Sequence, residues 1–178
     1  MNRRNALTIV TAAVWLGVVS HLAVFAQGQD KYTLKIPDGL AFSEFKGYET
    51  WEVVSVSRAK ETLNAIVGNP VMIAAYAAGF PGNGKPVPDG AKLVKIQYLP
   101  KVSTDPENAT IPDKLRDVAL MAKDSKRFAD SGGWGWGVFT YDAASNKFTP
   151  EGTGAKCGFA CHTSVKARDY VFTAFGTR

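Results

Sequence analysis

Two thiols and an imidazole lie within six residues near the end of the chain. Cys157 and Cys161 are separated by three residues, and His162 follows directly. Covalent haem attachment needs this set, because each sulfur adds to a porphyrin vinyl group and the adjacent ring nitrogen binds the iron. The only other histidine in the sequence, His21, lies in an N-terminal apolar stretch. The cluster therefore predicts a covalently attached haem c, with His162 as the iron ligand.

The gap between the two cysteines is one residue longer than the usual two. Residues four apart share one face of a helix, so both sulfurs can still straddle a porphyrin edge if the segment is helical. A disulfide between Cys157 and Cys161, with a bystander histidine, is one alternative, because paired thiols oxidise outside the cytoplasm. A zinc or copper site is another, but it requires a third or fourth strong ligand, which residues 27–178 lack.

The N-terminus has the pattern of an export signal. Arg3 and Arg4 make a basic start, an apolar run follows over residues 6–25, and small residues ending at Ala26 fit a cleavage site. The run is nearly long enough to span a bilayer, so an uncleaved anchor over residues 1–26 is an alternative. In both cases the rest of the chain is exported, and we expect it in a bacterial periplasm.

Residues 27–178 are expected to form a single haem domain, because they show no repeat, low-complexity tract or break in composition. Without residues 1–26, which contain two arginines and no acid, 19 basic and 16 acidic residues remain, a net charge of +3. This mild surplus is typical of a solvated surface. The sequence contains no basic cluster with interleaved aromatic residues, so it does not indicate a nucleic-acid partner.

The elements that must position the cluster are predicted from local patterns. Asn69 and Pro70 give an N-cap and a first-turn proline, and Gly79 ends the helix that they begin. Strands are predicted at residues 51–57, 91–99 and 134–141, with turn-rich loops at residues 80–90 and 100–112 and a short helix around the cysteines. Several strands with few helices indicate an α+β domain built mainly on an antiparallel sheet.

Three blocks of sequence carry a family resemblance. They are PDGAKLVK at residues 88–95, MAKDSKRFA running into GGWG within residues 121–135, and a tail from CHT to DYVFT at residues 161–173. Their order and spacing resemble the cytochrome P-460 family, which includes the cytochromes c′-beta, across roughly the whole exported chain. The resemblance implies a mainly antiparallel β fold, a homodimer, and one haem c near the C-terminus whose iron is bound by a histidine and otherwise open.

The resemblance also implies two catalytic residues. Lys95 matches the lysine that family enzymes bond covalently to the porphyrin, although a lysine in a strand usually faces solvent. In the predicted strand, Lys92 lies on the opposite face from Lys95, together with the more apolar Val94. Glu151 is the only acid between Asp142 and Cys157, so it matches the distal carboxylate that takes a proton during hydroxylamine oxidation, or it is a loop residue in water.

Three aromatic residues and two methionines are further candidates for the surroundings of the haem. Trp134, Trp136 and Phe139 line the haem pocket or pack in the core. Met72 and Met121 are potential sixth ligands, although buried methionines usually fill gaps.

Three functional classes remain open. An oxidoreductase would oxidise hydroxylamine or nitric oxide at the open iron and pass electrons to a soluble acceptor. A c′-beta-type protein would bind nitric oxide without turnover. A plain electron carrier would need a strong sixth ligand, and the absence of a second histidine from residues 27–178 disfavours it. We favour the first class.

Overall fold

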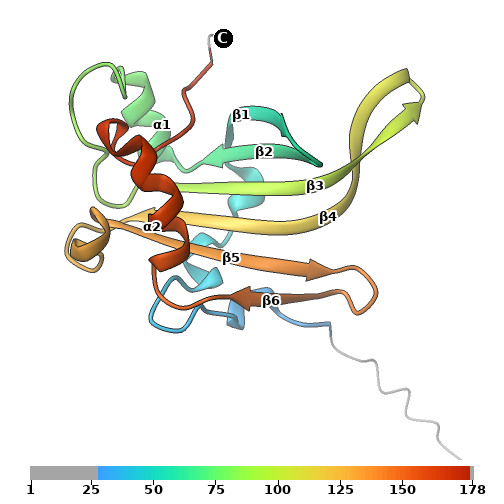
Figure 1. The fold of residues 1–178 in the computed structure, drawn as a ribbon, viewed down its shortest axis with the longest axis horizontal. Helices are drawn as coiled ribbons and strands as arrows, with labels where there is room; N and C mark the ends of the chain where they lie inside the picture. Colours follow the sequence, from blue (N-terminus) through green and yellow to red (C-terminus); the bar gives the residue numbers. More distant parts are fainter. Residues whose placement is uncertain (1–27, 177–178) are drawn as a thin grey trace, which may run out of the picture.

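The computed structural model describes residues 28–176, and the expected signal or anchor over residues 1–26 lies outside this range. The described part contains one six-stranded antiparallel sheet with sequential strand order (Figure 1). Its strands are β1 (Glu52–Ala59), β2 (Thr62–Gly68), β3 (Lys92–Thr104), β4 (Glu107–Lys123), β5 (Trp134–Asp142) and β6 (Lys147–Glu151). With a few short helices, this architecture is of the α+β class, as predicted.

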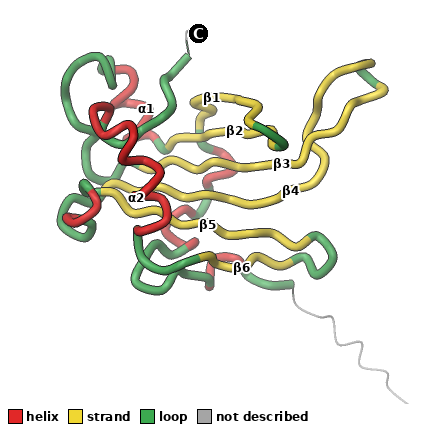
Figure 2. The backbone as a smooth tube through the Cα atoms, in the orientation of Figure 1, coloured by secondary structure: helices red, strands yellow, loops and turns green. Residues whose placement is uncertain are grey.

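Two α-helices and several 3₁₀ turns accompany the sheet (Figure 2). The helices are α1 (Pro70–Ala77) and α2 (Lys156–His162), and the turns are η1 (Lys31–Thr33), η2 (Phe42–Phe45), η3 (Tyr48–Thr50), η4 (Ala129–Ser131) and η5 (Thr163–Arg168). The predicted start of α1 is confirmed, since Asn69 Oδ1 accepts the backbone N–H of Met72 at 3.0 Å. The same oxygen accepts the N–H of Lys92 at 2.9 Å and ties the helix to β3.

The loop predicted at residues 100–112 is wrong. These residues extend β3 and β4 into a long hairpin, in which Pro100 lies opposite Pro112 and Val102 opposite Thr110. Figure 1 shows this hairpin reaching beyond the other strands. Its prolines and polar residues have no strand-like pattern, and the pairing of the two arms with each other keeps them extended.

The sheet has a hydrophobic core on each face. One core, which we call the back core, packs the N-terminal segment against the sheet through Phe42, Phe45, Val94, Val118 and Phe139 among others. The other core, the front core, lies beneath α1, α2 and the C-terminal tail and includes Leu93, Met121, Trp136 and Val171. Each buried side chain of this size contributes about 1.5–3 kcal/mol to folding, so both faces are held firmly.

Helix α2 lies directly on β5 because of a glycine. A Cβ atom at Gly158 would be 2.1 Å from Cγ and 2.5 Å from Cδ1 of Trp136, closer than carbon atoms can approach. Only a glycine therefore allows this approach. The contact places Cys161 and His162, which lie one turn further along α2, above the front face of the sheet.

Candidate haem site

His162 forms a hydrogen bond through one ring nitrogen, and the other ring nitrogen forms none with the described residues. Nδ1 lies 2.6 Å from the backbone oxygen of Tyr170. Because a carbonyl only accepts hydrogen bonds, Nδ1 carries the proton and Nε2 keeps its lone pair for a metal. Burial lowers the pKa of His162, and the charge of Lys95 lowers it further, while the Tyr170 hydrogen bond opposes them. The neutral ring that an iron ligand requires is therefore favoured.

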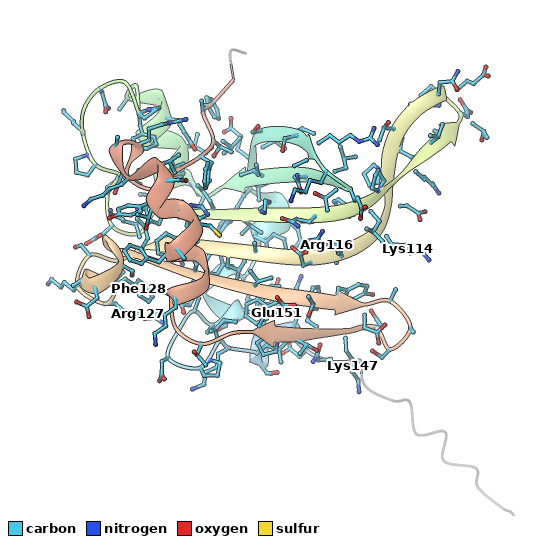
Figure 3. All side chains as sticks on the ribbon, in the orientation of Figure 1. Lys114, Arg116, Arg127, Phe128, Lys147 and Glu151 are labelled. Carbon is cyan, nitrogen blue, oxygen red and sulfur yellow. The ribbon has the colours of Figure 1, made fainter. Side chains whose placement is uncertain are left out.

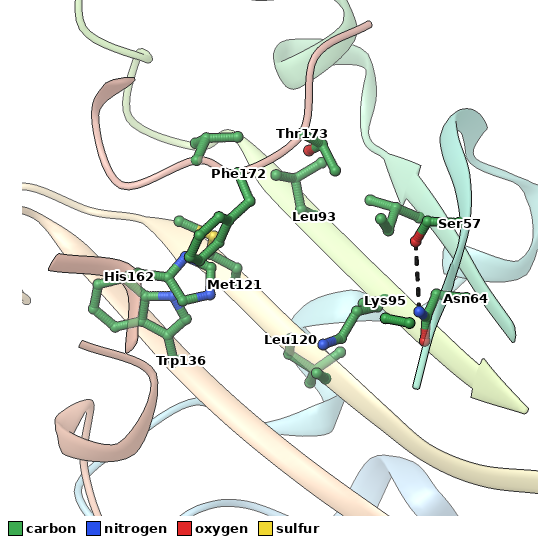
Figure 4. A pocket seen from close by; sticks show the side chains of 14 residues that line it. Ser57, Asn64, Leu93, Lys95, Leu120, Met121, Trp136, His162, Phe172 and Thr173 are labelled. Carbon is green, nitrogen blue, oxygen red and sulfur yellow. Dashed lines mark hydrogen bonds between the residues drawn. The ribbon is translucent and has the colours of Figure 1, made fainter. Parts of the chain in front are cut away.

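A cleft opens beside His162 on the front face. The space between its walls is about 850 Å³, with open solvent at its mouth included. Leu93, Met121 and Val171 give it apolar walls, and Ser57 and Asn64 lie at the end away from His162 (Figure 4). A mainly apolar cleft with an imidazole at one end suits a porphyrin, whose ring is flat and apolar.

Lys95 extends from β3 into the same cleft (Figure 4). Burial lowers the pKa of its amine, whereas the charges of Asp117 and Cys161 raise it in part. A larger share of the amine is therefore neutral, and so nucleophilic, than in an exposed lysine. Lys92 instead donates from the opposite face of the sheet to the carbonyl of Glu44, as the strand alternation predicts. The predicted partition of the two lysines is thus confirmed.

The two cysteines lie on a helix, as their spacing requires for the expected attachment. α2 runs from Lys156 to His162, so the backbones of Cys157 and Cys161 are one turn apart. The side chain of Cys157 is outside the described part of the structure. Cys161 is exposed and its sulfur forms no disulfide with any described side chain.

Two buried polar atoms at the cleft test its fit to a haem. Asn64 Oδ1 and Trp136 Nε1 are buried and have no hydrogen-bond partner among the described residues. Both residues line the cleft. Buried polar groups without partners are costly, so a group with polar substituents is expected beside them. A porphyrin carries an apolar ring, which suits the walls of the cleft, and carboxylates, which can accept from the Trp136 N–H but cannot donate to the Asn64 oxygen. The apolar walls and the indole therefore fit a haem, and the Asn64 oxygen requires a different donor. Among the described side chains, no group of three or more His, Cys, Asp and Glu is arranged to hold a metal ion.

Glu151 lies at the end of β6 and is exposed (Figure 3). It lines a smaller cavity, together with Trp136 and Gly158, and is not among the residues that line the cleft of His162 and Lys95. The structure thus brings together His162 and Lys95, and it separates Glu151 from both by the Trp136 side chain.

A second carboxylate, which the sequence did not single out, lies closer to Lys95. Asp117 is 4% exposed and accepts hydrogen bonds from Gln97 at 3.2 Å and Arg116 at 2.7 Å. Gln97 and Lys95 are two residues apart on β3, so their side chains lie on the same face of the sheet. Asp117 lies opposite Gln97 on β4 and therefore shares that face. No local pattern in the sequence marks this acid, because its pairing with Gln97 depends on the register of the β3–β4 hairpin.

The remaining sequence candidates separate between the cleft and the two cores. Trp136 and Met121 line the cleft. Trp134 and Met72 are fully buried in the front core and do not line the cleft. Phe139 is in the back core, where its ring centroid is 4.7 Å from that of Phe42.

Comparison with known proteins identifies the family. The family model of cytochrome P460 matches residues 45–173, a range that contains all three sequence blocks as well as Lys95 and His162. The chain belongs to the cytochrome P460 family. The predicted resemblance is confirmed, and membership makes the protein a c-type haem protein. A search of curated proteins found no match. Within residues 28–176, no helix is long and apolar enough to cross a bilayer.

Proposed function

We propose that this cytochrome P460-family protein is an exported monohaem oxidoreductase that oxidises hydroxylamine or nitric oxide. Cys157 and Cys161 hold the haem covalently near the C-terminus, and His162 binds the iron through Nε2. A haem held by these residues would supply the redox-active iron at which a small nitrogen compound could be oxidised, with a soluble acceptor taking the electrons.

The position of Lys95 carries this proposal. Its amine enters the same apolar cleft as the iron ligand, and burial lowers its pKa. A neutral amine can form an N–C bond to the porphyrin, in which an N–H and a C–H bond are lost and a peroxide-type oxidant takes the two electrons. Such a bond alters the porphyrin electronically, which distinguishes an oxidoreductase of this type from a simple gas-binding protein.

The protein side chains have separate tasks in this scheme. The apolar walls of the cleft, including Leu93 and Val171, exclude water from the reacting centre. Asn64 and Ser57, which are hydrogen-bonded to each other at 3.4 Å, offer polar groups at the end away from His162 (Figure 4). Glu151, which lines the neighbouring cavity that shares Trp136 with the cleft, is the proposed proton acceptor and would act from outside the cleft. The buried Asp117 is the carboxylate against which this role can be tested.

Nitric oxide binding without turnover is the second candidate. The cleft walls are mostly apolar, and a small uncharged diatomic ligand needs no charged partner there. In that case Lys95 remains unbonded, and the scaffold resembles the c′-beta branch of the family. We also propose that the protein is a periplasmic homodimer, with export directed by residues 1–26.

Absorption spectra of the wild type and of Lys95→Ala test whether the protein is the oxidoreductase with a Lys95–porphyrin bond or the nitric oxide binding protein without it. In the wild type, a porphyrin bonded to Lys95 lacks the ordinary c-type bands, and hydroxylamine reduces an artificial acceptor. In Lys95→Ala we expect an ordinary c-type spectrum, loss of that reduction, and haem still bound after denaturation to the peptide that contains Cys157 to His162.

Lys92→Ala is the matched control, because Lys92 lies in the same strand with its side chain on the opposite face of the sheet. It should leave spectrum and activity unchanged. If wild type and Lys95→Ala have identical c-type spectra and neither oxidises hydroxylamine, the oxidoreductase proposal is wrong and the gas-binding function replaces it. Recovery of a haem-free peptide with a Cys157–Cys161 disulfide would refute both.

A further inference from the structure

The hydrogen bond that orients His162 depends on an uncommon backbone turn. Its acceptor is the carbonyl of Tyr170, and Asp169 and Tyr170 have φ angles of 46° and 63°. Residues with a Cβ atom rarely adopt this left-handed region, and two in succession are held there only when their surroundings impose it. The turn therefore needs strong contacts on both residues.

The Asp169 carboxylate provides the first set of contacts. It accepts four hydrogen bonds, from Lys123 Nζ at 2.8 and 3.0 Å, from the Val87 backbone at 2.8 Å and from Trp134 Nε1 at 3.3 Å. The side chains of Lys123 and Asp169 are only 8% and 14% exposed. Lys123 ends β4, Trp134 begins β5 and Val87 precedes β3, so one carboxylate joins three parts of the sheet framework.

The Tyr170 ring provides the second set. It packs so closely on Gly132 that a Cβ atom there would be 2.2 Å from the ring. Gly132 in turn gives its carbonyl to Lys123 Nζ at 3.1 Å. Lys123 thus contacts both Asp169 and the segment against which Tyr170 rests, and the two halves of the turn are locked by one buried ion pair.

We propose that Asp169, together with Lys123, is a positioning residue for the haem iron. The ion pair holds the Asp169–Tyr170 turn, the turn aims the Tyr170 carbonyl at Nδ1 of His162, and that hydrogen bond sets how strongly His162 donates to the iron. The inference rests on the proposed role of His162 as the iron ligand. It gives a function to residues in two of the family blocks, which the haem-attachment motif alone leaves unexplained.

The expected effect has a definite sign. A carbonyl that accepts from Nδ1–H increases the basicity of the ligating imidazole. A more basic ligand favours ferric over ferrous iron, so loss of this hydrogen bond raises the reduction potential. We expect a tenfold or larger shift of the equilibrium towards ferrous iron, which corresponds to about 59 mV for a one-electron couple.

The test uses the haem-loaded protein with Asp169→Asn. This variant keeps the side-chain shape but removes the charge that pairs with Lys123. Two quantities are measured: the reduction potential, and the iron–histidine stretching band of the ferrous protein by resonance Raman spectroscopy. The potential should rise and the band should move to lower frequency. Because Asp169→Asn leaves a buried ammonium unpaired, Asp169→Asn/Lys123→Met is made as a second variant without that charge, and the same shifts are expected.

Val118→Ala is the control for general loss of stability. Val118 is fully buried in the back core on the opposite face of the sheet, so this change weakens the fold without contact to the turn. It should leave both quantities at the wild-type values. If the Asp169 variants also match the wild type, the positioning role is overturned while His162 remains the ligand. If the wild type itself has no iron–histidine band, the ligand assignment in the proposed function is wrong instead.

Discussion

Replacement of Gly158 by alanine tests how closely the haem-bearing helix must approach the sheet. The added Cβ would lie 2.1, 2.3 and 2.5 Å from the Cγ, Cβ and Cδ1 atoms of Trp136. Trp136 is 5% exposed, and its ring is surrounded by Phe159, His162 and Tyr170 at centroid distances of 6.0, 5.4 and 6.3 Å. These three rings restrict how far the indole can retreat from α2, so we expect α2 to move outward.

Two opposing contributions determine the change in stability. Alanine favours a helix over glycine by about 1 kcal/mol, whereas overpacking costs about 1–3 kcal/mol. Three contacts below 3 Å against a buried ring place Gly158→Ala at the upper end of that range. The expected net loss is about 2 kcal/mol in the free energy of unfolding, which lowers the Tm by roughly 4–8 °C for a domain of this size.

Thermal unfolding of the haem-loaded protein, with haem content measured alongside, provides the assay. Because α2 carries both Cys161 and His162, haem content should also fall. Ala160→Gly on the same helix is the control, since it lowers helix propensity at an exposed position away from Trp136. In a Trp136→Ala background, Gly158→Ala should become neutral or stabilising. A higher Tm for Gly158→Ala in the wild-type background would show that α2 does not rest on Trp136, and would refute the packing argument.

Two further predictions concern the proposed catalytic residues. If Glu151 takes the proton, Glu151→Gln should keep the wild-type spectrum and slow hydroxylamine oxidation by about a hundredfold or more. Asp117→Asn is the comparison variant. If Asp117→Asn is slow and Glu151→Gln is unaffected, Asp117 is the proton acceptor and Glu151 is not. Formation of the Lys95–porphyrin bond should accelerate with pH, because only the neutral amine reacts, and level off below pH 10.5, since burial lowers the pKa of Lys95 from that value. The rate of bond formation is measured by absorption spectroscopy on haem-loaded but unbonded protein treated with peroxide at a series of pH values. If this rate levels off only above pH 10.5, burial does not lower the pKa of Lys95 as expected.

The features predicted from sequence depend on neighbours along the chain. Asn69 and Pro70 begin α1 because cap and first-turn preferences act within four residues. Alternation along β3 places Lys95 and Lys92 on opposite faces because successive side chains in a strand point in opposite directions. The helical cysteine segment and the mainly antiparallel α+β fold follow from the same kind of short-range pattern.

Tertiary structure alone decides which distant residues meet. The partner of His162 Nδ1 is a backbone carbonyl, which every residue carries and no sequence pattern marks. Lys123 and Asp169 are 46 residues apart, and Asp117 contacts Gln97 through the long hairpin that the sequence predicts as a loop. Glu151 precedes the haem motif closely in sequence but lies beyond Trp136 from the cleft. These contacts depend on how two packed cores and six paired strands combine, and such non-local pairing leaves no periodicity in the chain.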